Sequence, residues 1–84
     1  NRQVFAFTRE YGSELVLCVF NLSHSPQPVE LDLTAYAGMV PIEMTGDTVF
    51  PPIRDVPYQL SLGVLGYYWF EIVDEETARR RHEG

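Results

Sequence analysis

The 84-residue chain is short enough to form one domain, which would bury only about 60% of the surface that its unfolded form exposes. A hydrophobic content of 45%, with 13% aromatic residues, is ample for a packed core and excludes wholesale disorder. A net charge of −6 disfavours binding to nucleic acids and to anionic membrane surfaces, which attract Lys and Arg.

The start of the chain and its single cysteine bear on its context. The chain begins at Asn1 without an initiator Met and enters an apolar strand pattern at 4–7, so we expect it to be part of a longer polypeptide. No stretch approaches the roughly 20 apolar residues of a membrane span. Cys18 is the single cysteine, which excludes an internal disulfide and favours a cytoplasmic location. The sequon at Asn21 is an alternative sign of a glycosylated secreted protein, although asparagine also suits a turn after a strand.

Short segments rich in β-branched and aromatic residues recur along the chain, separated by Gly, Pro, Ser and Asp, which is typical of a sandwich or barrel. We expect strands over residues 3–9 and 14–21, joined by a hairpin turn at 11–13. After a loop at 23–28, apolar and polar residues alternate over 29–33, which predicts a half-exposed strand.

The second half of the chain continues this pattern. A fourth strand is expected over 40–44, where Pro41 indicates a sheet edge or a bulge. A short strand at 48–50 should precede an irregular connection at 53–57. The last strands are predicted at 58–62 and 67–73. Together these segments predict an all-β antiparallel sandwich of Greek-key type, with about six to eight strands.

Beyond residue 73 the sequence changes character. The acidic residues 74–76 precede the basic run 79–81, an order that suits the dipole of a short helix. A helix of about ten residues is marginal on its own. We therefore predict a sandwich domain at 1–73, followed at 74–84 by a short tail or linker that is helical or disordered.

Two strands carry apolar residues on both faces. In the strand at 14–21 these residues are Leu15, Leu17 and Val19 on one face and Val16, Cys18 and Phe20 on the other. Such a strand should be central, with both faces covered. In the last strand the core positions should be Tyr68, Phe70 and Ile72, and the outer positions Tyr67, Trp69 and Glu71. Tyr67 and Trp69 are the candidate site residues, either as a docking surface or as a platform for stacking sugar rings.

The sequence contains few residues in patterns that could support catalysis. His24 lies between two serines in a proline-bounded loop, without the buried acid and oxyanion hole that a catalytic triad requires. Glu30, Asp32 and Glu43 occupy polar positions of half-exposed strands, which indicates solvated carboxylates rather than a glycosidase pair. Cys18 lies in an apolar strand, as an inert thiol does. We assign no catalytic residue to the chain.

The sequence likewise contains few residues in patterns that could bind a metal or a cofactor. One Cys and two His without paired spacing cannot complete a closed zinc site. Asp47 and Asp55 are more typical of turn formers than of calcium ligands. We assign no metal-binding or cofactor-binding residue.

Several segments, in order, resemble the C-terminal β-domain of the α-amylase superfamily. These are QVFAFTREY at 3–11, LCVFNLS at 17–23 and QPVELDL at 27–33. Further segments resemble the trehalose synthase (maltose α-D-glucosyltransferase) branch: VPIE at 40–43, FPPI at 50–53, PY at 57–58 and GYYWF at 66–70. The resemblance covers residues 3–73, and FPPI and GYYWF are its most specific parts.

The resemblance implies a parent enzyme that interconverts maltose and trehalose by retaining intramolecular transglycosylation in a (β/α)₈ barrel, which supplies both catalytic carboxylates. It also places the calcium sites of the family outside this chain. The chain itself is then expected to be a noncatalytic domain that packs against the upstream barrel. Contacts with other subunits or with maltokinase are further expected roles.

The alternative is an independent carbohydrate-binding or protein-interaction sandwich. The doubly apolar strand at 14–21 favours the first reading, because an autonomous module should keep its outer sheet polar apart from a small aromatic platform. No residues of the chain support a third interpretation, that of a standalone enzyme.

Overall fold

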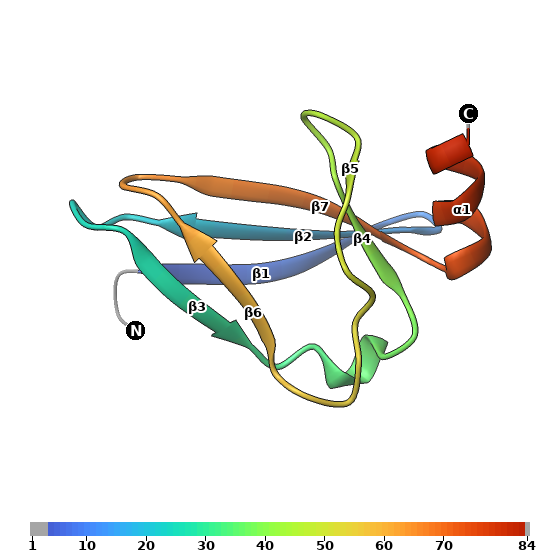
Figure 1. Cartoon of the computed structure of the whole chain (residues 1–84), viewed down its shortest axis with the longest axis horizontal. Coiled ribbons are helices and arrows are strands. Elements are labelled where there is room, and N and C mark those ends of the chain that lie inside the picture. The colour runs from blue at the N-terminus through green and yellow to red at the C-terminus, as the bar shows by residue number, and fades with distance from the viewer. Residues whose placement is uncertain (1–3, 84) are drawn as a thin grey trace.

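The chain folds into a five-stranded and a two-stranded antiparallel sheet that face each other, as a computed structural model of residues 4–83 shows (Figure 1). The elements in chain order are β1 (Val4–Tyr11), β2 (Glu14–Asn21), β3 (Gln27–Leu31), a 3₁₀ turn (Thr34–Tyr36), β4 (Val40–Glu43), β5 (Thr48–Val49), β6 (Tyr58–Leu62), β7 (Tyr67–Val73) and α1 (Glu75–Glu83). The predicted all-β sandwich is confirmed. Residues 1–3 and 84 of the predicted domain and tail lie outside the described residues.

The order of strands in the large sheet is β1–β2–β7–β4–β5, and the small sheet pairs β3 with β6. The last strand, β7, therefore lies between β2 and β4, and the chain crosses between the sheets four times. This non-sequential order is of the kind expected for Greek-key connections. It places β2 in the interior of the large sheet, as its two apolar faces predict.

The β1–β2 hairpin pairs continuously from Val4↔Asn21 to Tyr11↔Glu14 around a two-residue turn. Gly12, the first turn residue, has φ 61°, a conformation that costs glycine nothing and that type II′ hairpin turns require there. The predicted hairpin is confirmed, although β1 extends two residues beyond the expected end at residue 9.

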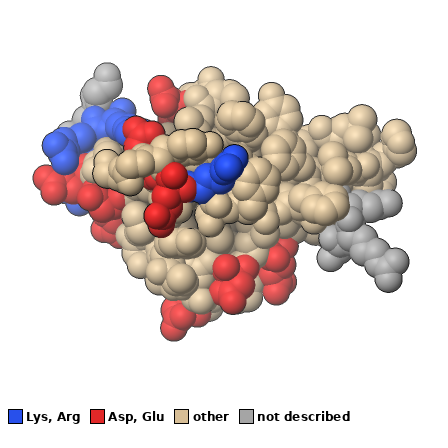
Figure 2. Space-filling view, turned by 180° about the vertical axis from the view of Figure 1, so that it is seen from behind, with Lys and Arg blue, Asp and Glu red and all other residues tan. Residues whose placement is uncertain are grey.

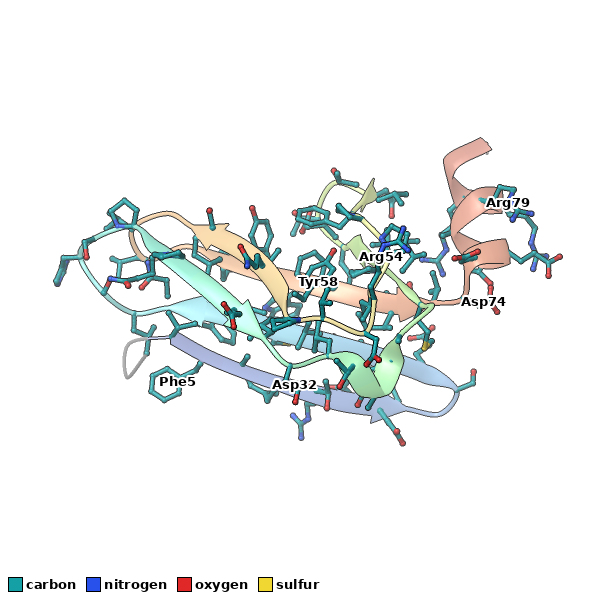
Figure 3. All side chains as sticks on the ribbon, turned by 60° about the horizontal axis from the view of Figure 1, so that its bottom comes forward. Phe5, Asp32, Arg54, Tyr58, Asp74 and Arg79 are labelled. Carbon is teal, nitrogen blue, oxygen red and sulfur yellow. The ribbon has the colours of Figure 1, made fainter. Side chains whose placement is uncertain are left out.

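The core lies between the two sheets, where the predicted alternation holds. In β6 the side chains of Tyr58, Leu60 and Leu62 are buried, while the residues between them are exposed. Tyr58 lies between the sheets (Figure 3) and donates a hydrogen bond to the carbonyl of Pro51 at 2.6 Å. This bond fixes the irregular connection that the sequence predicts before β6. From β7, Phe70 is fully buried.

The strand predicted at 29–33 has the expected length but lies two residues earlier, at Gln27–Leu31, and so takes up the end of the loop expected at 23–28. β3 ends at Leu31 because the carboxylate of Asp32 accepts hydrogen bonds from the backbone N–H (3.2 Å) and hydroxyl (2.8 Å) of Thr34. These bonds turn the chain into the 3₁₀ segment, since aspartate readily captures nearby backbone donors. Leu33 still reaches the core, with 6% of its surface exposed.

The interpretation of Pro41 as an edge or bulge residue is wrong. β4 lies between β7 and β5, and its register with β7 runs without a bulge from Val40↔Val73 to Glu43↔Phe70. The carbonyl of Pro41 accepts a hydrogen bond from the N–H of Phe50 at 2.9 Å. Because the N and C=O of a strand residue point to the same side, the proline nitrogen faces the end of the two-residue β5. The pairing with β7 therefore loses no donor.

The residues after β7 form the helix α1, which packs on the sandwich. Asp74 begins it by accepting a hydrogen bond from the N–H of Thr77 at 2.7 Å. Ala78 then lies buried against Val40, Ile42 and Val73 of the large sheet. This packing stabilises a helix that would be marginal alone.

Candidate functional site

The outer face of the large sheet carries the candidate site. The register of β1, β2 and β7 places Phe5, Phe20 and Tyr67 side by side in one row across this face. The next row consists of Phe7, Cys18 and Trp69. Phe5 projects from β1 on the side away from the small sheet (Figure 3). We call Phe5, Phe7, Tyr11, Phe20, Met44, Tyr67 and Trp69 the aromatic face.

The rings of the aromatic face pack against one another. Phe20 stacks between Phe7, at a centroid distance of 6.1 Å, and Tyr67, at 6.4 Å. Even so, Tyr67 is 57% exposed and Trp69 45% exposed. Figure 2 views this side of the molecule, and uncharged residues form broad stretches of it. The rings therefore pack against one another, but their outer surfaces remain exposed to solvent.

The helix α1 covers only one end of the same face. Ala78 of the helix covers Ile42 and Val73. Val73 points to the same side of the sheet as Trp69 because odd-numbered residues of β7 share one face, and Ile42 does so because it pairs with Glu71 on that face. Arg81 of the helix donates a hydrogen bond to the carboxylate of Glu71 at 2.5 Å. Charged residues gather most densely at this end in Figure 2. The uncovered remainder is the aromatic face.

A shallow depression of about 450 Å³ lies in the aromatic face, with Val16 and Cys18 among its lining residues. Burial raises the pKa of the Cys18 thiol, an effect that Arg9 opposes only in part. A raised pKa keeps the thiol protonated and unreactive. The lining of the depression is mostly apolar. The protonated thiol agrees with the prediction that Cys18 is inert.

The facing of β7 follows the predicted alternation, so Tyr67 and Trp69 do lie on the outer face. Sequence reasoning placed Phe20 with Val16 and Cys18 on one face of β2 without identifying that face as the outer one, and it missed the rings that β1 contributes. Phe5 and Phe7 alternate with Val4 and Ala6, which shows that they share a face. The alternation could not say which face was the outer one, because both sets are apolar.

Two of the three carboxylates considered for glycoside chemistry, Asp32 and Glu43, accept hydrogen bonds that hold turns. Glu43 accepts hydrogen bonds from the N–H (2.8 Å) and hydroxyl (2.5 Å) of Thr45, and these bonds lower its pKa. Asp32 is held by Thr34 in the same way, with its pKa lowered for the same reason. Among the residues that the structure describes, no three His, Cys, Asp or Glu side chains converge as metal ligands. In the same range, no helix is long and apolar enough to cross a membrane.

The sequon at Asn21 is a structural feature of the fold. Asn21 is fully buried, and its amide donates to the carbonyls of Ser25 (3.0 Å) and Gly63 (2.9 Å). Its side-chain oxygen accepts the N–H of Ser23 at 3.0 Å. Glycosylation is therefore incompatible with the fold. Asn21 instead joins two loops at this end of the sandwich, and the neighbouring His24 is exposed.

The fold and the residue pattern define a member of a known class of domain. The maltogenic amylase C-terminal domain family matches residues 1–69, and the chain belongs to this family. It is 45% identical over 84 residues to a trehalose synthase from Pimelobacter sp. (strain R48), an alignment that covers 95% of this chain and 15% of that protein.

Two further relatives are similar over most of the chain. A trehalose synthase/amylase TreS from Mycobacterium tuberculosis (strain ATCC 25618 / H37Rv) is 44% identical over 80 residues, or 92% of this chain and 13% of that protein. A trehalose synthase from Thermus thermophilus is 43% identical over 77 residues, or 92% of this chain and 8% of that protein. The chain thus spans 8–15% of the length of these relatives.

Proposed function

We propose that this chain is the noncatalytic C-terminal domain of a trehalose synthase-like enzyme and docks onto the rest of that enzyme through the aromatic face. The single observation that carries the docking role is a group of stacked rings on the outer face of the large sheet, in which Phe7 and Tyr67 remain exposed on either side of the half-buried Phe20. The family membership and the relatives, which are much longer than this chain, support the parent enzyme.

The composition of the aromatic face suits contact with another protein surface. Aromatic residues and Met are enriched at protein interfaces, whereas exposed patches of this kind are uncommon on monomeric proteins. Its depression has few charged lining residues, Arg9 and Glu14. A sugar site would require convergent hydrogen-bonding groups beside the rings. The face therefore favours docking over sugar binding.

The proposed partner is the upstream (β/α)₈ barrel of the same polypeptide. A covalently linked surface is present at a high effective concentration, so even a modest apolar contact would hold the domain in place. The barrel would carry out the interconversion of maltose and trehalose, with any calcium bound outside this chain. Contacts with other subunits or with maltokinase are further roles that this surface could serve.

We also propose that residues 1–73 are the sandwich domain, that 74–84 are its C-terminal extension, and that the protein is cytoplasmic. The buried, unpaired Cys18 and the buried sequon asparagine both support a cytoplasmic protein.

The experiment that tests docking compares two equally exposed apolar positions in the full-length enzyme. Tyr67 lies in the aromatic face at 57% exposure, and Val56 lies in the loop before β6 at 59%. We expect Tyr67→Glu to accelerate thermal inactivation of maltose–trehalose interconversion, because it places a charge in a buried contact. Val56→Glu should leave the inactivation rate nearly unchanged. Equal effects of the two substitutions would contradict docking through the aromatic face.

A further inference from the structure

The outer edge of β1 is an unusually well-formed free edge. Among the described strands β1 pairs with β2 alone, and it does so over eight residues without a bulge, Pro or Gly. Sheet edges are normally protected by short length, proline or bulges, because unpaired backbone groups recruit further strands. At the opposite edge of the sheet, β5 has only two residues. Over residues 4–8 the edge of β1 has no such protection, and its two charged residues, Arg9 and Glu10, lie near the end of the strand.

The hairpin geometry identifies which backbone groups of β1 face outward. In a two-residue hairpin the residues that flank the turn, here Tyr11 and Glu14, form a hydrogen-bonded pair, and such pairs then alternate along the strands. Residues 5, 7, 9 and 11 therefore direct their N–H and C=O groups toward β2. Residues 4, 6, 8 and 10 direct theirs to the free edge.

Beside this edge the sandwich is open. Two hollows of about 310 and 420 Å³ lie between β1 and the small sheet, and Ala6 contributes to the lining of both. Apolar side chains, including Leu17, Leu31 and Leu33, line these hollows. Ala6 and Thr8 point toward the small sheet but stay exposed. Among the described residues no segment fills these hollows, although Leu17 and Leu33 are themselves buried.

We propose that the edge of β1 is completed by an antiparallel strand from the same polypeptide, immediately N-terminal to this chain. The inference rests on the proposed function, because it requires the longer enzyme that the relatives indicate. Every pairing among the described strands of the large sheet is antiparallel, and consecutive strands are neighbours in about two-thirds of cases. β1 already pairs with its successor, so its predecessor is the favoured partner on the other side.

The chemistry of the added strand follows from the two surfaces that flank it. On its inner side it faces the hollows beside Ala6 and Thr8, so it should carry apolar residues that close the core. On its outer side it continues the two rows that contain Phe5 and Phe7, and it would extend the aromatic face by one strand. The strand should therefore be apolar on both sides, as a strand with both faces covered is.

Hydrogen exchange at single-residue resolution in the full-length enzyme tests the proposal. At a free edge, the amides of residues 4, 6, 8 and 10 should exchange on the order of 100-fold faster than those of residues 5, 7 and 9. The added strand removes this alternation, so all seven amides should be protected to a similar degree. Persistent alternation in the full-length enzyme would overturn the proposal.

A matched pair of variants checks that the protection comes from the edge. Thr8 on β1 and Thr48 on β5 are both exposed strand residues at opposite edges of the large sheet. Thr8→Asp places a charge in the hollow that the strand would close, and it should restore fast exchange at residues 4, 6 and 8. Thr48→Asp should leave β1 protected. Equal effects of the two changes on β1 would contradict the proposal.

Three other outcomes separate this inference from its alternatives. Protection that disappears on dilution, as the enzyme dissociates into single chains, would assign the edge to a second copy and overturn the intramolecular strand. Protected outward amides together with an insensitive Tyr67→Glu variant would uphold the added strand and reject docking through the aromatic face. Fast exchange of the outward amides together with faster inactivation of the Tyr67→Glu variant would uphold docking and reject the added strand.

Discussion

Trp69 and Phe70 are consecutive residues that point to opposite sides of the large sheet, and their truncation distinguishes the core from the proposed docking surface. Phe70 is 0% exposed and packs edge-on against Phe50 at a centroid distance of 4.8 Å. Trp69 is 45% exposed on the aromatic face. Replacing each residue with Ala therefore perturbs one face and leaves the other intact.

The expected magnitudes follow from burial. Phe70→Ala should cost about 3–5 kcal/mol wherever the domain is placed, because it removes a fully buried ring. Docking of the aromatic face would bury the exposed part of Trp69, roughly 100 Å², which is worth about 2.5 kcal/mol. Trp69→Ala should therefore destabilise the domain in the full-length enzyme by about 2 kcal/mol more than in the isolated 84-residue chain.

Denaturant unfolding of both variants, each in the full-length enzyme and in the isolated chain, measures these differences. Phe70→Ala should damage both proteins, and Trp69→Ala chiefly the longer one. Equal destabilisation of the two proteins by Trp69→Ala would refute docking. Maltooligosaccharide binding by the isolated chain, measured by calorimetry, completes the test. Binding that Trp69→Ala abolishes, with the stability of the full-length enzyme unchanged, would make the face a sugar platform.

Three further predictions concern single groups. Asn21→Ala should destabilise the isolated chain by about 2–3 kcal/mol in urea unfolding, because it leaves the buried N–H of Ser23 and the partly buried carbonyls of Ser25 and Gly63 without their partner. An effect below about 0.5 kcal/mol would contradict the role of Asn21 between the loops. Hydrogen bonds from Thr77 lower the pKa of Asp74, so its contribution to α1 should be present above pH 3.8 and lost as pH falls below that value. Circular dichroism should show this acid loss of helix, and Asp74→Ala should remove it. Burial raises the pKa of Tyr58 to about 12, so its stabilising effect holds below pH 10 and is lost as pH rises through 12. A phenolate titrating near pH 12 should disappear from the 295 nm absorbance titration of Tyr58→Phe.

The sequence predicted the strands and their facing because both depend on local patterns. A period-two alternation assigned the buried and exposed sides of β6 and β7, and a glycine between two apolar runs placed the β1–β2 hairpin. Local chemistry also explains the boundary errors. The early end of β3 depends on hydrogen bonds from Thr34 to the side chain of Asp32, which alternation does not reveal.

The candidate site was only partly predictable. Tyr67 and Trp69 could be assigned to the outer face because the acidic Glu71 shares their side of β7. Phe5 and Phe7 could not, because both sides of β1 are uncharged over the first residues of the strand. Only the register with β2 and β7 shows that these four rings lie in adjacent rows of one face.

The sequence by itself determined the all-β class, the apolar character of both faces of β2 and the family resemblance, since residue type and spacing encode these directly. Tertiary structure decided the order of the strands, because pairing between distant segments leaves no local pattern. That order inserts β7 between β2 and β4, places Pro41 in an interior strand and leaves β1 at the edge of the sheet that the described strands form. It also brings α1 over one end of the outer face through Ala78, and so sets where the exposed aromatic face begins.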